Sequence, residues 1–235
     1  MSAEITPRDR KLLCDCISSC FLSFEQIHWR FFRGRAESTV SNRLKALEKK
    51  GMIKSQKVGI FIHNGIPKQI NRIYEATNKA KRFLHIPIDF RQKTKSPKSY
   101  VALYHDLVLN DVLYEMVQKE INFDFRVSSN IKSNLETDIV PDALLYPENE
   151  EKPIAVELEL TAKSEKRYRE LFLKYRFSKD FSKVIYICGN QNILKKIERI
   201  LRDMGISFED RFMSFKLIDD YFRGARVKSK VKSHF

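Results

Sequence analysis

The stretch Ile139–Leu160, "IVPDALLYPENEEKPIAVELEL", decides how we expect the second half of the chain to fold. Two apolar runs flank the polar segment "PENEEKP", a pattern typical of two strands joined by a tight turn. Alternation along the second run places Glu157 and Glu159 on one face and the apolar side chains on the other. Pairing of the two strands then brings Asp142 close to both glutamates.

Three carboxylates on one patch of a sheet repel one another unless a cation joins them or one stays protonated. Mg²⁺ and Mn²⁺ favour hard oxygen ligands, activate water and stabilise charge on a phosphodiester. We therefore expect Asp142, Glu157 and Glu159 to ligate Mg²⁺ or Mn²⁺. Asp111, on the inward stripe of a preceding long helix, is a fourth candidate ligand. The alternative is a solvated acidic edge with no chemistry.

Lysines and tyrosines follow the acidic strand. Lys163 shares the parity of the two glutamates on an extended strand and is expected to supply a catalytic positive charge, with Lys166 and Lys174 as alternatives. Tyr168 and Tyr175 lie seven residues apart, on one face of the next predicted helix. Either tyrosine can attack a phosphate, or both can pack in the core.

The order of elements over residues 97–218 is a long helix, three strands, then helix, strand, helix and strand. This order predicts an α/β domain with a mixed sheet over residues 99–222.

Residues 1–90 predict a winged helix-turn-helix domain: three helices, a hairpin around "HNG" and a closing helix. Thr6, Ser23 and Ser38 are the expected helix caps, and Gly51 is expected to end the third helix. The residues expected to reach DNA from the third helix and the wing are Ser38, Thr39, Ser41, Asn42, Arg43, Lys45, Lys54, Lys57, Lys68 and Arg72. The alternative is a winged helix used for protein contacts or dimerisation.

Charge supports this division of the chain, whose net charge is +14. Residues 1–90 carry +9, a linker at residues 91–98 carries +4, and a tail at residues 223–235 carries +5. Residues 99–222 carry −4. The pattern indicates that double-stranded DNA is held by the first module and presented to the second.

The remaining composition favours a cytoplasmic protein. We find no apolar run long enough for membrane insertion and no signal-peptide pattern at the first residues. The four cysteines have no zinc spacing and are expected to be free thiols.

Two family resemblances rest on these motifs. Pro141-Asp142 followed by an acid-x-acid strand resembles the PD-(D/E)xK nuclease fold, although Glu159 stands where that family usually has lysine. "YHDLVLNDV", "PDALL" and "VELELTAKSEKRY", behind a winged helix, resemble the MobC-type relaxases of mobilisable plasmids and the wider replication-relaxation family. That resemblance implies an enzyme that recognises a plasmid transfer origin, nicks one strand at a metal held by Asp142, Glu157 and Glu159, and works with a coupling protein or other relaxosome proteins.

The expected function is therefore a metal-dependent DNA nickase. One alternative is a non-catalytic DNA-binding accessory protein or replication regulator with a nuclease-like scaffold. Another is a restriction or transposon nuclease that cuts both strands.

Overall fold

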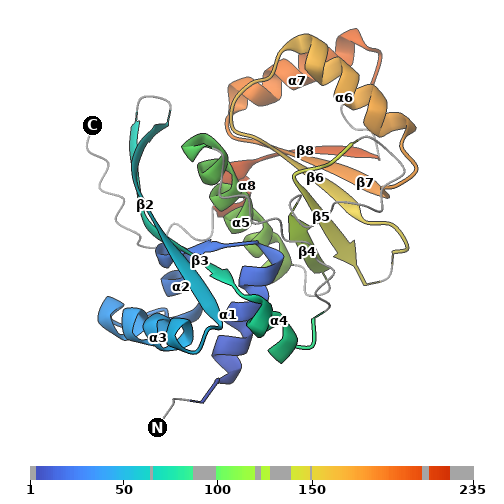
Figure 1. The fold of residues 1–235 in the computed structure, drawn as a ribbon. Helices are drawn as coiled ribbons and strands as arrows, with labels where there is room; N and C mark the ends of the chain where they lie inside the picture. Colours follow the sequence, from blue (N-terminus) through green and yellow to red (C-terminus); the bar gives the residue numbers. More distant parts are fainter. Residues whose placement is uncertain are drawn as a thin grey trace. The chain divides into compact units, whose positions relative to one another are not determined.

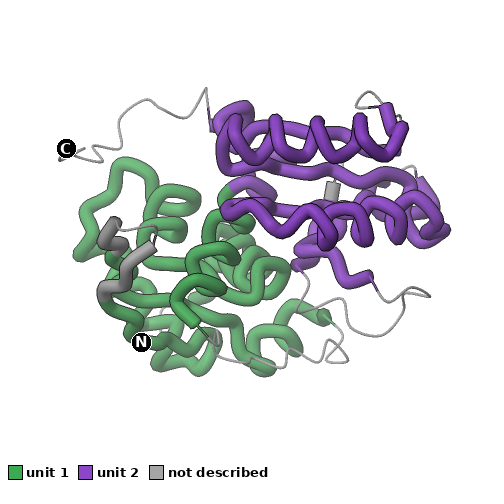
Figure 2. Tube along the Cα trace, turned by 90° about the horizontal axis from the view of Figure 1, so that it is seen from above, with its two compact units in different colours: residues 1–111 green, residues 112–235 purple. Residues whose placement is uncertain are grey.

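The computed structural model describes residues 4–63, 66–86, 99–119, 123–127, 139–148, 150–207 and 212–222. The chain forms two compact units, residues 1–111 and 112–235 (Figure 2). The division lies within helix α5 (Tyr100–Lys119), after the segment 91–98 that the sequence predicts as a linker. That segment and the tail at residues 223–235 lie outside the described residues.

The first unit contains the predicted series of three helices, a hairpin and a short helix (Figure 1). Its elements are α1 (Pro7–Ser18), β1 (Leu22–Ser23), α2 (Phe24–Phe31), α3 (Glu37–Lys49), β2 (Ile53–His63), β3 (Ile66–Ala76) and α4 (Asn78–Phe83). The three strands form an antiparallel sheet in the order β1-β3-β2.

The caps of the first two helices confirm the sequence prediction. The Thr6 hydroxyl accepts from the N–H of Asp9, whose carboxylate accepts from the N–H of Thr6, which closes a capping box on α1. Ser23 and Gln26 form the same reciprocal pair on α2. Each box satisfies two backbone donors that a helix start otherwise leaves without a partner.

The predicted cap of α3 is wrong. The helix begins at Glu37, the cap residue is Ala36, and no side chain accepts a hydrogen bond there. Ser38 therefore lies inside the first turn, where its side chain is exposed. Gly51 follows the helix with φ of +70°, as expected for a glycine that ends a helix.

A polar cluster joins the first half of α5 to α1 and α2. The Arg30 guanidinium donates to the Asn110 carbonyl and to Asp111 Oδ1, and lies 3.7 Å from Asp15. The Gln26 amide donates to Asp111 Oδ1 at 2.9 Å. Because these bonds end at Asp111, they explain why the start of α5 belongs to the first unit.

The second unit is built on a five-stranded mixed sheet in the order β4-β5-β6-β7-β8. Its elements are β4 (Phe123–Val127), β5 (Ala143–Pro147), β6 (Ile154–Glu159), α6 (Glu165–Phe177), β7 (Lys183–Cys188), α7 (Gln191–Asp203), β8 (Met213–Leu217) and α8 (Ile218–Phe222). β4, β5 and β6 pair antiparallel, whereas β6, β7 and β8 pair parallel.

Helices α6 and α7 cover one face of this sheet (Figure 1). Each helix connects two adjacent parallel strands, and crossovers of the same hand place both helices on the same side. The core beneath them is rich in aromatic and branched side chains, including Leu144, Ala155, Tyr168, Phe172, Tyr175, Val184, Tyr186, Ile193, Ile197 and Ile200.

Two further findings bear on the sequence predictions. No helix in the described part of the chain is long and apolar enough to cross a bilayer. All four cysteines are free thiols, with Cys14 exposed and the other three buried.

Candidate active site

The two glutamates of β6 are buried, with Glu157 5% and Glu159 2% exposed. They share a strand face with Ala155, which packs in the core under α6 and α7. The sequence predicts an acidic face, and the structure places that face beneath α6. The Tyr175 hydroxyl donates to Glu157 Oε1, and the Tyr168 hydroxyl lies 3.4 Å from Glu159 Oε2.

Asp142 joins the two glutamates from the residue before β5. The register pairs Ala143 with Val156, so Asp142 lies beside Glu157 on the neighbouring strand. The backbone N–H of Leu158 donates to Asp142 Oδ2 at 2.9 Å, which holds the aspartate against β6. The three carboxylates predicted from the sequence are therefore brought together.

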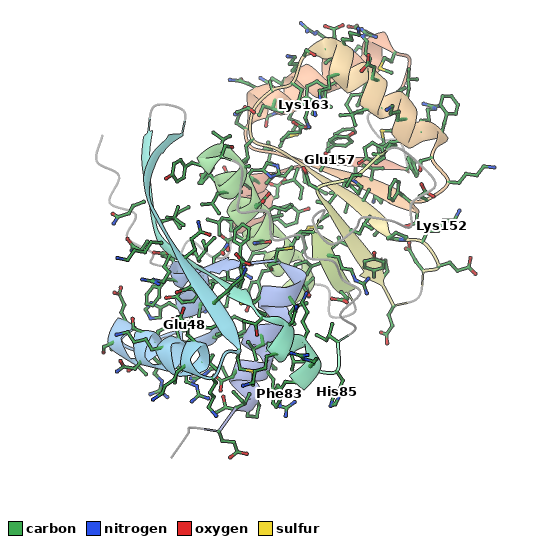
Figure 3. All side chains as sticks on the ribbon, viewed as in Figure 1. Glu48, Phe83, His85, Lys152, Glu157 and Lys163 are labelled. Carbon is green, nitrogen blue, oxygen red and sulfur yellow. The ribbon has the colours of Figure 1, made fainter. Side chains whose placement is uncertain are left out.

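Lys163 also reaches the cluster, by a route that differs from the predicted one. β6 ends at Glu159, so strand parity does not place the lysine. Instead the chain turns after β6, and Lys163 follows that turn (Figure 3). The Lys163 ammonium forms an ion pair with Glu159. The Tyr168 hydroxyl accepts from the Lys163 N–H at 3.2 Å, and Lys196 of α7 donates to the Lys163 carbonyl at 2.7 Å.

The other two lysine candidates lie outside this cluster. Lys166 and Lys174 are both exposed on α6. Of the three predicted lysines, Lys163 is thus the one that forms an ion pair with the acidic cluster.

Gly189 fixes the end of β6 from the neighbouring strand. Its N–H donates to the Glu159 carbonyl at 2.8 Å. A Cβ at this position would lie 3.2 Å from that carbonyl oxygen and 3.2 Å from Leu160 Cα. Because Gly189 has no side chain, the end of β7 can lie close to the turn that follows Glu159.

Burial and mutual repulsion raise the pKa values of the two glutamates. Burial, followed by the negative charge of Asp142, raises the pKa of Glu157 to about 8, although the Tyr175 hydrogen bond opposes the shift. Burial also raises the pKa of Glu159, and the Lys163 ammonium opposes it. The cluster consequently holds a proton near neutral pH when no other cation is present.

The two tyrosines predicted as possible nucleophiles are fully buried. Burial is the main cause that raises the pKa of both hydroxyls. The neighbouring Glu157 carboxylate raises the pKa of Tyr175 further. A buried, protonated hydroxyl is a poor nucleophile. These geometries suit hydroxyls that hold the glutamates in place, so neither tyrosine attacks phosphate in the mechanism proposed below.

The donor chemistry of the cluster fits a hard divalent cation. Three carboxylates lie near one ammonium, and after burial it is the negative charge of Asp142 that raises the pKa of Glu157. The geometry is not that of an assembled metal site. No group of three or more His, Cys, Asp or Glu within the described residues is arranged to hold an ion.

Asp111, the fourth predicted ligand, belongs to the first unit. Its carboxylate accepts from Arg30 and Gln26, so it already has two polar partners there. These bonds hold the Asp111 carboxylate against α2.

Most of the predicted DNA contacts of α3 are accessible. Ser38, Thr39, Asn42 and Lys45 are exposed, and Ser41 is half-buried. Arg43 differs, because its guanidinium forms an ion pair with the buried Asp9 and also donates to the Glu4 carbonyl. Arg43 thus joins α3 to α1.

The hairpin residues divide in the same way. Lys54 and Lys57 are both exposed, although Lys54 also forms an ion pair with Glu75 at 2.9 Å, and Arg72 donates to the Ser55 hydroxyl at 2.6 Å. The backbone of Lys68 pairs with Phe61, and its side chain lies outside the described residues.

Two residues of the site were missed in the sequence. Gly189 directly follows the apolar run "KVIYIC", and a glycine at a strand end is a signal for close backbone approach. Lys196 sits in the amphipathic run "NILKKIERI", where nothing distinguishes it from a solvated lysine.

Comparisons with known proteins add little to this geometry. No family model matches the chain, and no curated protein matches its sequence. Among solved structures, the chain is similar to restriction endonuclease FokI, with 11% identity and a TM-score of 0.31 over 95% of this chain and 46% of that one. The chain thus spans about half of that protein's length. A likeness at this level supports no conclusion about what the chain does.

Proposed function

We propose that the protein is a divalent-metal-dependent DNA endonuclease that nicks one strand. In this proposal the first unit is a winged-helix DNA-binding module and the second is a nuclease domain of the PD-(D/E)xK type. The observation that carries it is the placement of Asp142, Glu157 and Glu159 on adjacent strands, with Lys163 paired to Glu159.

Asp142, Glu157 and Glu159 would hold Mg²⁺ or Mn²⁺ through carboxylate oxygens. A bound ion of this kind supplies positive charge at a phosphodiester and makes a bound water more acidic. Both effects are what strand cleavage by water requires.

The chain's own residues position and balance charge. The Tyr175 and Tyr168 hydroxyls orient Glu157 and Glu159 from α6. Lys163 neutralises Glu159 in the free protein and would place its ammonium on the phosphate oxygen that gains charge during cleavage. Glu157, with a pKa of about 8, is mostly protonated near neutral pH in the free protein and would give up that proton on ligating a cation.

The first unit would position the DNA. α3 offers exposed hydroxyl, amide and ammonium groups, which are the groups that contact base edges and phosphates. The resemblance of "VELELTAKSEKRY" to MobC-type relaxases favours a plasmid transfer origin as the target and a coupling protein as partner.

One observation favours a second candidate, a non-catalytic DNA-binding regulator. Glu157 is bonded to Tyr175 and Glu159 to Lys163, and no three-ligand group is assembled in the described part of the chain. Such a protein would bind DNA with the same first unit and would leave it uncut.

A supercoiled-plasmid assay tests these proposals. The plasmid carries the protein's native neighbouring DNA, and the reactions contain Mg²⁺, Mn²⁺ or EDTA. The variants are Glu159→Ala and, as a matched control, Glu151→Ala on the exposed turn before β6. Metal-dependent open circles that only Glu159→Ala removes would support the nickase. Linear products would indicate double-strand cutting, and binding without any cut would favour the regulator.

A further inference from the structure

The outward face of α6 exposes two large apolar side chains. Leu173 is 46% and Phe177 78% exposed, whereas Tyr168, Phe172 and Tyr175 on the inward face are fully buried. Leu173 and Phe177 are four residues apart, so they are neighbours on the helix surface. Phe177 is the last residue of the helix.

Positive charge predominates around this apolar pair, although the exposed Glu170 lies one turn before Leu173 and Lys174. Residues 171–179, "LFLKYRFSK", contain Lys174, Arg176 and Lys179 and no acid. All three side chains are exposed. This contrasts with the net charge of −4 over residues 99–222. We call Leu173, Lys174, Arg176, Phe177 and Lys179 the Phe177 surface.

We propose that the Phe177 surface binds single-stranded DNA. A base would stack on the Phe177 ring while the cations contact the adjoining phosphates, which is the combination that single-strand binding uses. Two apolar side chains fall well short of the roughly 800 Å² that each partner of a standard protein–protein interface buries. They suit one or two bases.

The position of the surface connects it with the acidic site. Tyr175, two residues before Phe177, donates to Glu157 from the opposite face of the same helix. α6 therefore contacts the acidic site through its inner face and carries the Phe177 surface on its outer face. The biological use of the surface, to retain the strand that a nick releases, rests on the proposed function, but the binding itself requires no cutting.

Binding is measured by the fluorescence anisotropy of labelled dT12, with EDTA present so that cleavage plays no part. Phe177→Ala should weaken binding by about 10-fold, since it removes a stacking partner. The double variant Lys174→Ala with Arg176→Ala should reduce the salt slope by about 1.4, since each phosphate contact on a single strand contributes about 0.7. Tyr100→Ala, which removes an aromatic ring that is 52% exposed on α5, is the matched control and should bind as the wild type does.

A spectroscopic measurement reports the stacking directly. Phe177→Trp is made together with Trp29→Phe, because Trp29 is the one natural tryptophan of the chain. Addition of dT12 should quench the introduced indole. Wild-type affinity of Phe177→Ala, or an indole that dT12 leaves unquenched, would overturn the inference. So would sedimentation showing that Phe177→Asp dissolves a dimer, because the surface would then be a self-contact. Intact dT12 binding by a protein that never nicks would refute the proposed function and leave this inference in place.

Discussion

Tyr175 of α6 donates a hydrogen bond to Glu157 of β6, and both side chains are buried. A helix that covers a sheet usually contributes apolar contacts alone, and here it also holds a carboxylate in the core. The hydrogen bond lowers the pKa of Glu157, against the larger opposing effects of burial and of Asp142. The tyrosine therefore favours the ionised form of this glutamate, although burial and Asp142 outweigh it.

Tyr175→Phe should keep nicking activity and shift its pH dependence. Without the hydroxyl, the pKa of Glu157 rises, so the rising limb of the activity profile should move to higher pH. Loss of this buried hydrogen bond should also lower the free energy of unfolding by about 1 kcal/mol. Plasmid nicking between pH 6 and pH 9 and urea unfolding measure the two effects.

The same variant separates a positioning role from a nucleophilic one. A tyrosine nucleophile would leave the wild-type protein covalently joined to nicked DNA, and phenol extraction would then move that DNA out of the aqueous phase. Such an adduct, absent from Tyr175→Phe, would contradict the positioning role. Tyr168→Phe provides the parallel case for Glu159.

Gly189→Ala should destabilise the protein and impair the site. A glycine-to-alanine change usually stabilises where the backbone tolerates it. Here the added Cβ meets the Glu159 carbonyl and Leu160 Cα, both of which are backbone atoms. We expect a loss of about 1–2 kcal/mol, as for other overpacked positions. Thermal unfolding and the nicking rate are the measurements, and Ser182→Ala, at an exposed position before β7, is the control. An unchanged or raised stability would show that the backbone at Glu159 and Leu160 can shift to accommodate the added Cβ.

Local patterns predicted the backbone of the acidic site better than its surroundings. The polar turn and the alternation of β6 suffice to pair Asp142 with Glu157, because strand register is a local property. The burial of the glutamates depends on α6 packing over them, which no spacing in the sequence reveals. Strand parity does not explain why Lys163 lies near Glu159, because β6 ends at Glu159 and the chain turns there.

A helical wheel has the same limit in the first unit. It places Arg43 of α3 among polar, accessible residues, since the wheel contains no information about α1. The structure pairs Arg43 with Asp9, which is fully buried and also closes the cap of α1. Tertiary contacts therefore remove one residue from a predicted recognition surface and leave its neighbours in place.

Arg43 and Lys45 should therefore respond differently to substitution. Arg43→Gln leaves the buried Asp9 without its cation and should lower the free energy of unfolding by about 3 kcal/mol. Lys45→Ala, at an exposed position, should leave stability unchanged and reduce the salt slope of duplex binding by about 1. Urea unfolding and DNA titrations at several salt concentrations test both. Equal stability of the two variants would show that the Arg43–Asp9 pair contributes nothing.

Asp15→Asn should stabilise the protein at neutral pH. Burial raises the pKa of Asp15 from 3.8 to about 6 even though Arg30 lies 3.7 Å away, so desolvation outweighs the attraction. The folded state binds this proton more tightly than the unfolded state does. Stability therefore falls as pH rises from about 4 to about 6 and is constant above that range, as far as this group is concerned.

The asparagine variant removes that pH dependence. We expect a gain of about 2 kcal/mol at pH 7.5 and no difference from the wild type below about pH 4. Urea unfolding at several pH values gives both numbers, with Glu37→Gln on the exposed start of α3 as the comparison. A destabilised variant at pH 7.5 would mean that the ion pair with Arg30 prevails.

The division of the chain within α5 constrains how the protein can be taken apart. A fragment that ends in the segment 91–98 would lack Asn110 and Asp111, the two groups that α5 offers to Arg30. A buried guanidinium deprived of these acceptors costs several kcal/mol. Folding of an exchanged first unit would thus be preserved only if the crossover falls after Asp111, whether the exchange occurs between genes or in the laboratory. The first unit is therefore inherited together with the first half of α5, and the rest of that helix begins the second unit.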